Sequence, residues 1–367
     1  MRRHKAVTIF IILLVNASVF FFYNDIAVWI GGIMPGDANY QVDITEIAPP
    51  SETLRTSLYA DEFIEIGISH DGAGDDINGN IVDYIVLEGI THNSDKGYIM
   101  LAFEDPKSAD EADKTIYQQT FGAPAAEPFS IAVAVPDTEL ERLNVQIYTN
   151  SEQYGTFASW VYDSVVISKD GNGWQFERRM DIYKRNYELY MSAKSTLPDE
   201  SIYISDAVRE LSDAITADCE TDYQKLVAIH DWVCENIYYD YDVFNSSGMQ
   251  DIAPDDIIKS RRTMCSGYAQ LTRALVLAQG IPCIIAEGYA LGIQEDSWDN
   301  DKLESGAVNH DWNEAYADGR WVIMDNTWDS KNRYENGEYE TVTNCGYTYF
   351  DSDLSFFSLK HSVLRYK

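Results

Sequence analysis

The stretch RRTMCSGYAQLTRALVLAQGIP, residues 261–282, places a cysteine, Cys265, at the point where a helix is expected to begin. The apolar residues that follow recur at helical spacing and form one stripe: Leu271, Leu275 and Ala278. Gly280 is typical of the residue just beyond a helix end, and Pro282 prevents the helix from continuing. The pattern therefore predicts a helix over residues 265–279, with Cys265 in its first turn.

A cysteine in this position has two interpretations. The unpaired backbone N–H groups of a helix N-terminus favour a thiolate and can bind an oxyanion. Ser266 and Gly267 add little bulk beside the sulfur, so a substrate backbone has room to approach. Taken alone, however, Cys265 is more simply explained as a buried structural thiol. A nucleophilic thiol also needs a base and a group that orients the base.

The stretch NHDWNEAYADGRWVIMDNTWDS, residues 309–330, contains candidates for both groups. Asp318 and Gly319 form a strong signal for a two-residue β-hairpin turn between two apolar runs. Such a turn pairs Ala317 with Arg320 and fixes the register of both strands. A three-residue loop would instead shift the register by one and reverse which side chains share a face.

With the two-residue turn, Trp312 lies opposite Asp325, and His310 lies on the same face as Trp312. His310 and Asp325 are then diagonal neighbours whose side chains can meet, which would fix the tautomer of the imidazole. Asp311 points to the other face, and Asp329 lies further along the ladder, so Asp325 is the preferred partner. A structural His–Asp contact in an inert sheet is the alternative.

Three motifs in order resemble the transglutaminase-like superfamily, in its bacterial secreted or membrane-anchored branch. They are KLVAIHDWVCENIYYD, IIKSRRTMCSGYAQLTRALVLAQGIPCIIAEGYA and NHDWNEAYADGRWVIMDNTWD. The resemblance covers residues 200–355 and implies an α+β fold with a papain-like core. In such a core a helix carrying the cysteine packs on an antiparallel sheet carrying the histidine and aspartate. It implies Cys265 as nucleophile, His310 as base and Asp325 as orienting acid. Because the sequence shows no metal motif, we expect no cofactor and no metal.

Two residues depart from the family pattern, and two more are candidates for contact with substrate. Asp311 stands where the family often has a small apolar residue, and its charge would raise the pKa of a nearby imidazole. Asn326 replaces a usual proline. Tyr239 fits the upstream pattern, either packing at the cleft edge or contacting substrate. Trp312 is a second candidate substrate-binding residue, although we expect it, with Trp328, mainly to cover the hairpin.

The first half of the chain reads as β structure. Alternating runs such as FIEIGIS and YIMLAF are separated by turn signals such as NSDKG and SKDGNG. We expect a linker at 31–60, a β-sandwich-like module at 61–185, the transglutaminase-like domain at 200–355 and a C-terminal tail at 356–367. The module contains no concentrated set of catalytic residue types, and we interpret it as a spacer or binding module.

The N-terminus predicts export. A basic start, MRRHK, precedes an 18-residue apolar run, AVTIFIILLVNASVFFFY. We expect residues 1–30 to be a signal or, preferably, an uncleaved anchor, giving a single-pass membrane protein with an extracellular domain or a secreted one. The net charge of −33 argues against a nucleic-acid partner, because phosphate would be repelled.

The remaining cysteine and histidine residues show no spacing typical of a metal site. The chain has five cysteines, an odd number, so at least one is unpaired within the chain. His230 and Cys234 lie four apart on a predicted helix, and we interpret both as packing residues. Cys283 is expected in a core strand, and His361, in the tail, is expected to be structural.

Two classes of function remain open. The first is a thiol acyl-transfer enzyme of the cell envelope that hydrolyses or cross-links amides of protein or peptidoglycan-peptide substrates through a Cys265 thioester. The second is a non-catalytic envelope protein that keeps the fold as a binding scaffold. An intact set of Cys265, His310 and Asp325 favours the enzyme. A structural adhesin led by the β-module is a weaker third possibility.

Overall fold

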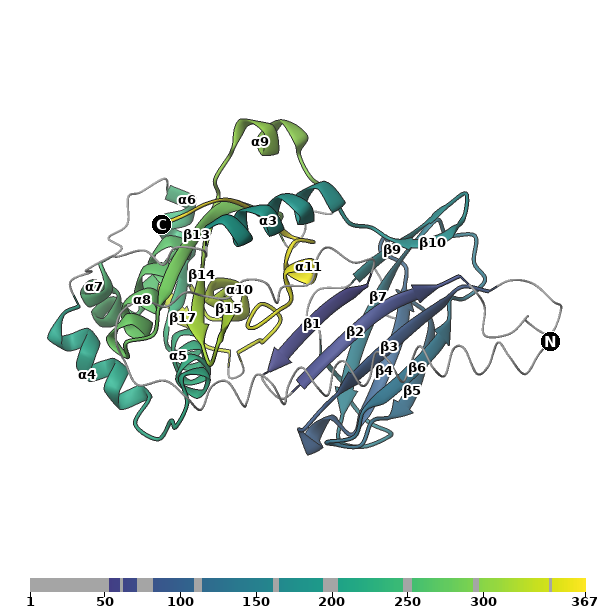
Figure 1. Ribbon diagram of the computed structural model, residues 1–367, viewed down its shortest axis with the longest axis horizontal. Coiled ribbons are helices and arrows are strands. Elements are labelled where there is room, and N and C mark those ends of the chain that lie inside the picture. The colour runs from purple at the N-terminus through teal and green to yellow at the C-terminus, as the bar shows by residue number, and fades with distance from the viewer. Residues whose placement is uncertain are drawn as a thin grey trace.

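The computed structural model describes residues 53–59, 62–70, 82–108, 114–160, 165–193, 204–246, 253–292, 297–342 and 345–367. Figure 1 shows two domains side by side, a β domain from the first half of the chain and a mixed α/β domain from the second. The expected anchor at 1–30 lies outside the described residues. Among the residues described, no helix is long and apolar enough to cross a membrane.

The N-terminal module consists of two antiparallel sheets around one core. One sheet has the order β1 (Leu54–Tyr59), β2 (Glu62–Ser69), β3 (Tyr84–Ile90), β6 (Phe129–Ala134). The other has the order β10 (Gly173–Phe176), β9 (Val165–Asp170), β7 (Arg142–Asn150), β4 (Tyr98–Glu104), β5 (Thr115–Gly122), with β8 (Ala158–Ser159) paired to β7 and a 3₁₀ turn η2 at Ser94–Lys96. Alternate residues such as Ile64 and Ile66 are buried, as a strand with one solvated face requires.

Two boundaries of this module differ from those expected. Residues 54–59, expected within the linker, form strand β1, because Leu54 is buried in the core and the backbone pairs with β2. At the other end, the last module strand finishes at residue 176, and helix α3 (Met180–Ala193) follows. Tyr183 and Tyr190 of α3 are buried against the second domain, so α3 packs with that domain rather than with the module.

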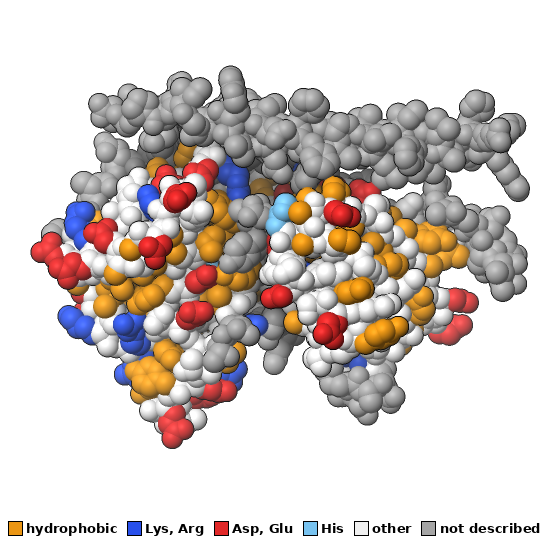
Figure 2. Space-filling view, turned by 90° about the horizontal axis from the view of Figure 1, so that it is seen from below, with side chains coloured by type: hydrophobic (Ala, Val, Ile, Leu, Met, Phe, Trp, Pro, Cys, Tyr) orange, Lys and Arg blue, Asp and Glu red, His pale blue; other side chains and the backbone are white. Residues whose placement is uncertain are grey.

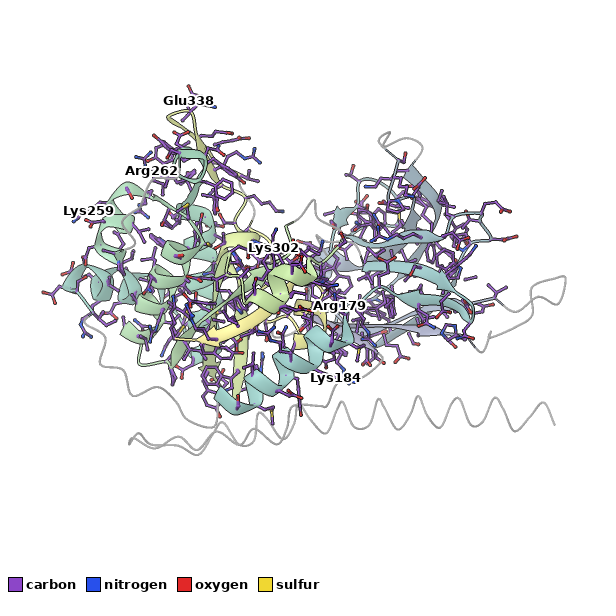
Figure 3. All side chains as sticks on the ribbon, turned by 90° about the horizontal axis from the view of Figure 1, so that it is seen from above. Arg179, Lys184, Lys259, Arg262, Lys302 and Glu338 are labelled. Carbon is purple, nitrogen blue, oxygen red and sulfur yellow. The ribbon has the colours of Figure 1, made fainter. Side chains whose placement is uncertain are left out.

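The second domain contains a helical layer and a small mixed sheet. The helices are α4 (Asp206–Ile215), α5 (Asp222–Asn236), α6 (Tyr241–Ser246), α7 (Pro254–Ser260), α8 (Cys265–Ala278) and α9 (Asn300–Ser305). The small sheet has the order β12 (Arg262–Thr263), β11 (Tyr238–Asp240), β16 (Arg333–Glu335), β17 (Glu338–Glu340), and β11 runs parallel to both of its neighbours. Figure 3 shows Glu338 and Arg262 at one end of the domain, far from Arg179. Arg179 lies just before α3 and donates a hydrogen bond to Asn300 of α9.

The main sheet of this domain is fully antiparallel, as predicted. Its order is β15 (Arg320–Met324), β14 (His310–Ala317), β13 (Cys283–Ala290), β18 (His361–Tyr366). One face shares a core with α8 through Cys283 and Ala315, and the other packs on α3 through Ile284 and Trp312. Successive residues of these strands contact α8 and α3 in turn, because side chains of a strand point alternately to its two faces and both faces are buried here.

The C-terminal segment 356–367, expected as a tail, is part of the fold. Its strand β18 pairs with β13, and Val363 is buried in the core, which holds the segment in place. The preceding helix α11 (Leu354–Phe357) joins the two domains: Phe356 packs in the core of the module and Phe357 in the core of the second domain. Figure 2 shows Asp and Glu side chains scattered over the visible face rather than gathered into one patch.

Candidate active site

The predicted cysteine helix is confirmed, with Cys265 as its first residue. The preceding residue, Met264, provides no side-chain cap, and Gly280 has the left-handed φ of 77° expected after the helix end. Gly267 is required for close packing in the first turn, since a Cβ there would lie 1.8 Å from Oγ1 of Thr263. The Cys265 thiol is partly exposed, so it is not the buried structural thiol of the alternative interpretation.

The hairpin register is also confirmed. Asp318 and Gly319 both have positive φ, 49° and 87°, as a two-residue turn of this type requires. Ala317 pairs with Arg320 in the ladder of β14 and β15. His310 opens β14, but β15 ends one residue before Asp325.

Asp325 is therefore the N-cap of a one-turn helix, α10 (Asn326–Asp329), rather than a strand residue. Its Oδ1 accepts hydrogen bonds from the backbone N–H groups of Thr327 and Trp328, at 3.1 and 3.2 Å. Its Oδ2 remains available to the sheet side. An N-cap carboxylate gains from the helix dipole as well as from these bonds, so the local structure holds Asp325 in its ionised form.

The structure brings Cys265, His310 and Asp325 together. Nε2 of His310 lies 2.6 Å from Oδ2 of Asp325, and the Cys265 thiol contacts the same imidazole and lies 4.0 Å from the carbonyl oxygen of Asn309. Because Nε2 is bound to the carboxylate, Nδ1 is the nitrogen available to the sulfur. Each of the three residues stands at the beginning or end of its element, which allows side chains from a helix and a sheet to converge.

The charges at the site reinforce one another. Burial opposes a charged ring at His310, but the attraction and hydrogen bond of Asp325, together with Cys265, outweigh it and raise the pKa of His310 to about 10. Asp325 is fully buried, yet His310 and His361 hold the pKa of its carboxyl well below the ordinary range. The pair is therefore an imidazolium and a carboxylate at neutral pH.

His361 is the residue of this site that the sequence interpretation missed. Its Nε2 lies 3.0 Å from the same Oδ2 of Asp325, so two imidazoles bind one carboxylate oxygen. Its ring stacks on Phe357 at 3.8 Å and 16°, and burial lowers the pKa of His361 to about 4. The sequence predicted a tail with a structural histidine here, because nothing in it connects His361 with residues 36 or more positions away.

The other predicted residues take different places. Tyr239 lies near Cys265, and burial and the charges of Cys265 and Tyr241 raise its pKa. Trp312 is 1 % exposed and stacks beside His310 at 6.0 Å, which favours packing over substrate contact. Asp311 does not bind His310: it hydrogen-bonds Ser266 on the α8 side of the sheet.

His310, Asp325 and His361 also form a group whose ligand atoms lie within 4.8 Å of one another, a spacing compatible with a metal ion. The four hydrogen bonds accepted by Asp325 account for this group without a metal, since every carboxylate oxygen already has donors. A thiol, an imidazole and a buried carboxylate in this arrangement are the groups that covalent catalysis by a cysteine needs, and His361 adds a second imidazole to the carboxylate.

Comparison with known proteins agrees with this geometry. Residues 209–326 match the family model of the transglutaminase-like superfamily, a span that contains Cys265, His310 and Asp325. The chain carries a transglutaminase-like domain. The match ends before His361, so the second imidazole comes from a segment that the family model does not cover.

The curated relatives are peptidases by name. The chain is 26 % identical over 196 residues to the Kyphoscoliosis peptidases of Mus musculus and Homo sapiens, which is 53 % of this chain and 28 % of each relative. The chain thus matches less than a third of the length of these relatives. A crystal structure of a candidate cysteine protease from Cytophaga hutchinsonii is 15 % identical and covers 78 % of this chain and 89 % of its own, with a TM-score of 0.28.

Proposed function

We propose that the transglutaminase-like domain is a thiol acyl-transfer enzyme in which Cys265 attacks an amide carbonyl. The observation that carries the proposal is the partly exposed sulfur at the start of α8 beside an imidazole that is held at 2.6 Å by a buried carboxylate. A thiol with a base and an orienting acid is the arrangement needed for covalent catalysis. The family match at residues 209–326 supports an enzyme of cysteine-peptidase type.

The chemistry runs in two steps. The Cys265 thiolate adds to the amide carbonyl, and the backbone N–H groups at the start of α8 face the developing oxyanion. The C–N bond then breaks, His310 donates its proton to the leaving amine, and a Cys265 thioester remains. Water or a second amine attacks the thioester, His310 takes the proton from that nucleophile, and the C–S bond breaks to restore the thiolate.

The electrostatics suit the first step. His310 is positively charged at neutral pH because the carboxylate of Asp325 raises the pKa of the imidazole. A cation next to the sulfur stabilises a thiolate. Asp325 in turn is fixed by its cap bonds and by His361, so the ring cannot turn away from Cys265 without breaking buried hydrogen bonds. The arrangement is pre-organised before substrate arrives, which lowers the reorganisation needed during reaction.

The substrate class and location are part of the proposal. The apolar run near the N-terminus supports an exported or membrane-anchored protein, and the substrate would then be a protein or a peptidoglycan peptide at the cell envelope. The names of the curated relatives favour hydrolysis over cross-linking. Tyr239, partly exposed near Cys265, is the residue proposed to contact the substrate.

The first test is pH-dependent alkylation of the purified protein with iodoacetamide, with each labelled cysteine mapped by mass spectrometry. We expect fast labelling of Cys265 below pH 7, and loss of that fast phase in His310→Ala. Cys219 is the internal control, because it is also partly exposed but lies outside the site. Equal labelling of both thiols across pH would contradict the enzyme and favour a binding scaffold.

The second test determines whether water or an amine reacts with the Cys265 thioester. The protein and its Cys265→Ala variant are incubated with casein and a fluorescent primary amine. New N-termini without fluorescence indicate hydrolysis, and fluorescent casein indicates cross-linking. Either product, absent from the variant, supports acyl transfer. Neither product with casein and with peptidoglycan peptides would reject these substrate classes.

A further inference from the structure

A second cluster of ligating side chains lies outside the catalytic site, on helix α5 and the segment that precedes β18. His230 and Asp231 come from α5, and Cys345 lies 114 residues after Asp231 in sequence. The fold brings one nitrogen, one carboxylate oxygen and one sulfur from these residues within 4.8 Å of one another. No local sequence motif joins them, which is why their spacing along the chain gave no sign of a metal site.

The distances within this cluster match those between ligands of one small cation. Nδ1 of His230 lies 3.0 Å from Oδ1 of Asp231, and Sγ of Cys345 lies 3.6 Å from the same oxygen. Tetrahedral zinc, with bonds of roughly 2.0 Å to N or O and 2.3 Å to S, separates N from O by about 3.3 Å and S from O by about 3.5 Å. The agreement to a few tenths of an ångström means that binding requires only small side-chain movements.

A buried carboxylate orients the imidazole in the way that metal-binding histidines require. Nε2 of His230 lies 3.2 Å from Oδ2 of Asp329, which is 1 % exposed. Without an ion, Nδ1 donates to Asp231, and loss of that proton on metal binding would leave Nε2–H donated to Asp329 and the Nδ1 lone pair facing the ion. Such carboxylate–histidine pairs set the tautomer and basicity of metal ligands. In the absence of an ion, Oδ1 of Asp231 accepts hydrogen bonds from Nδ1 of His230, the Cys345 thiol and the Tyr347 hydroxyl, so a bound cation would take the place of the protons on the nitrogen and the sulfur.

We propose that His230, Asp231 and Cys345 bind a divalent cation of the zinc class. Imidazole, thiolate and carboxylate together suit zinc better than magnesium or calcium, which prefer oxygen ligands. Asp231 and Cys345 are partly exposed, so the ion enters from solvent and a water molecule completes its tetrahedron. The role is structural, since the ion joins α5 to the Cys345 segment.

The ion would also support the catalytic acid without touching the reaction. Asp329, which orients His230, ends helix α10, and its N–H donates to the carbonyl of Asp325 at 3.1 Å. Gly346, next to Cys345, donates its N–H to the carbonyl of Asp329 at 2.8 Å. The proposed site therefore supports the segment 325–329 at its Asp329 end, through His230 and Gly346.

The test uses the full chain in a Cys265→Ala background, so that the catalytic thiol cannot bind metal. The protein is reduced, loaded with Co²⁺ or Zn²⁺ and freed of excess ion, and bound metal is measured by elemental analysis. Thiolate-to-cobalt absorption in the near ultraviolet reports sulfur coordination. We expect a single bound ion and a Tm that rises with zinc.

The variants Cys345→Ser and Asp231→Asn should lose the cobalt band and weaken binding about 100-fold or more, whereas Asp329→Asn should weaken it about 10- to 100-fold. Cys219→Ser is the matched control, because Cys219 is partly exposed and lies outside the cluster. Absence of bound cobalt in the folded, reduced chain would overturn the proposal, and so would metal retained in Cys345→Ser. The result is independent of catalysis, since Cys265 is absent throughout.

Discussion

His361 supplies the sharpest prediction, because it binds Asp325, the proposed catalytic acid, from a strand outside the family match. In His361→Phe the ring stacked on Phe357 is kept, but one of the four hydrogen bonds to Asp325 is lost. A hydrogen bond to a charged group contributes roughly 1.5–3 kcal/mol, and this bond stabilises only the ionised carboxylate. Since one pKa unit corresponds to about 1.4 kcal/mol, the pKa of Asp325 should rise by about 1–2 units.

The assay is the rate of Cys265 alkylation by iodoacetamide as a function of pH, which needs no substrate. Protonation of Asp325 removes the charge that holds His310 as an imidazolium, and alkylation then slows. We therefore expect the acid limb of the profile to move up by about 1–2 pH units in His361→Phe. In His361→Gln, which keeps an N–H donor, the limb should stay near its original position.

Thermal unfolding separates this effect from damage to the fold. Phenylalanine is larger than histidine, so His361→Phe should lower stability by about 1–3 kcal/mol through overpacking. Phe357→Leu serves as the matched control, since it disturbs the same packing and leaves the bond between His361 and Asp325. A folded His361→Phe protein whose alkylation profile coincides with that of Phe357→Leu would refute the positioning role.

Three further predictions follow from the same geometry. Asp325→Asn removes the main cause of the raised pKa of His310, so burial should lower that pKa below its ordinary value and slow Cys265 alkylation at pH 6 by about 10-fold or more. The interactions that raise the pKa of His310 stabilise the fold fully below pH ~6.5, and this stabilisation is lost as the pH rises through about 10. The free energy of unfolding, measured in denaturant titrations, should therefore fall across that range, and it should not fall in this way in His310→Gln. Gly267→Ala places a Cβ 1.8 Å from Oγ1 of Thr263 and should lower stability by about 1–3 kcal/mol in thermal unfolding, unlike Gly171→Ala, where nothing lies within 4 Å.

The sequence was sufficient where local rules determine the structure. Asp318 and Gly319 select a turn of one length, and that length sets which residues of β14 and β15 face each other. Gly280 ends α8 for an equally local reason, the low cost of positive φ at glycine. From these two signals the meeting of His310 with Asp325, and the place of Cys265, could be predicted before any coordinates.

The sequence was insufficient where position depends on segments far apart in the chain. The sequence predicted a linker where strand β1 lies and a tail where strand β18 lies. Both strands were missed because a short edge strand has weak periodicity and gains its stability from the strand it pairs with. Asp325 was expected on a strand, yet the bonds from Thr327 and Trp328 make it a helix cap. The cluster of His230 with Cys345 depends on a separation of more than 100 residues and on the folded position of α5.

Helix α11 gives the N-terminal module a physical connection to Asp325. Phe356 is buried in the core of the module, and the N–H of Arg55 in β1 donates to Oγ of Ser355 at 3.2 Å. The next residue, Phe357, is fully buried and stacks on His361, which binds Asp325. Adjacent residues of a single turn thus belong to two different cores.

Any shift of the module against the second domain must move Phe357, break the buried contact with Phe356, or unwind α11, and close-packed cores resist each of these changes. The packing of α11 therefore links the position of the β-module to that of Asp325 through Phe356, Phe357 and His361.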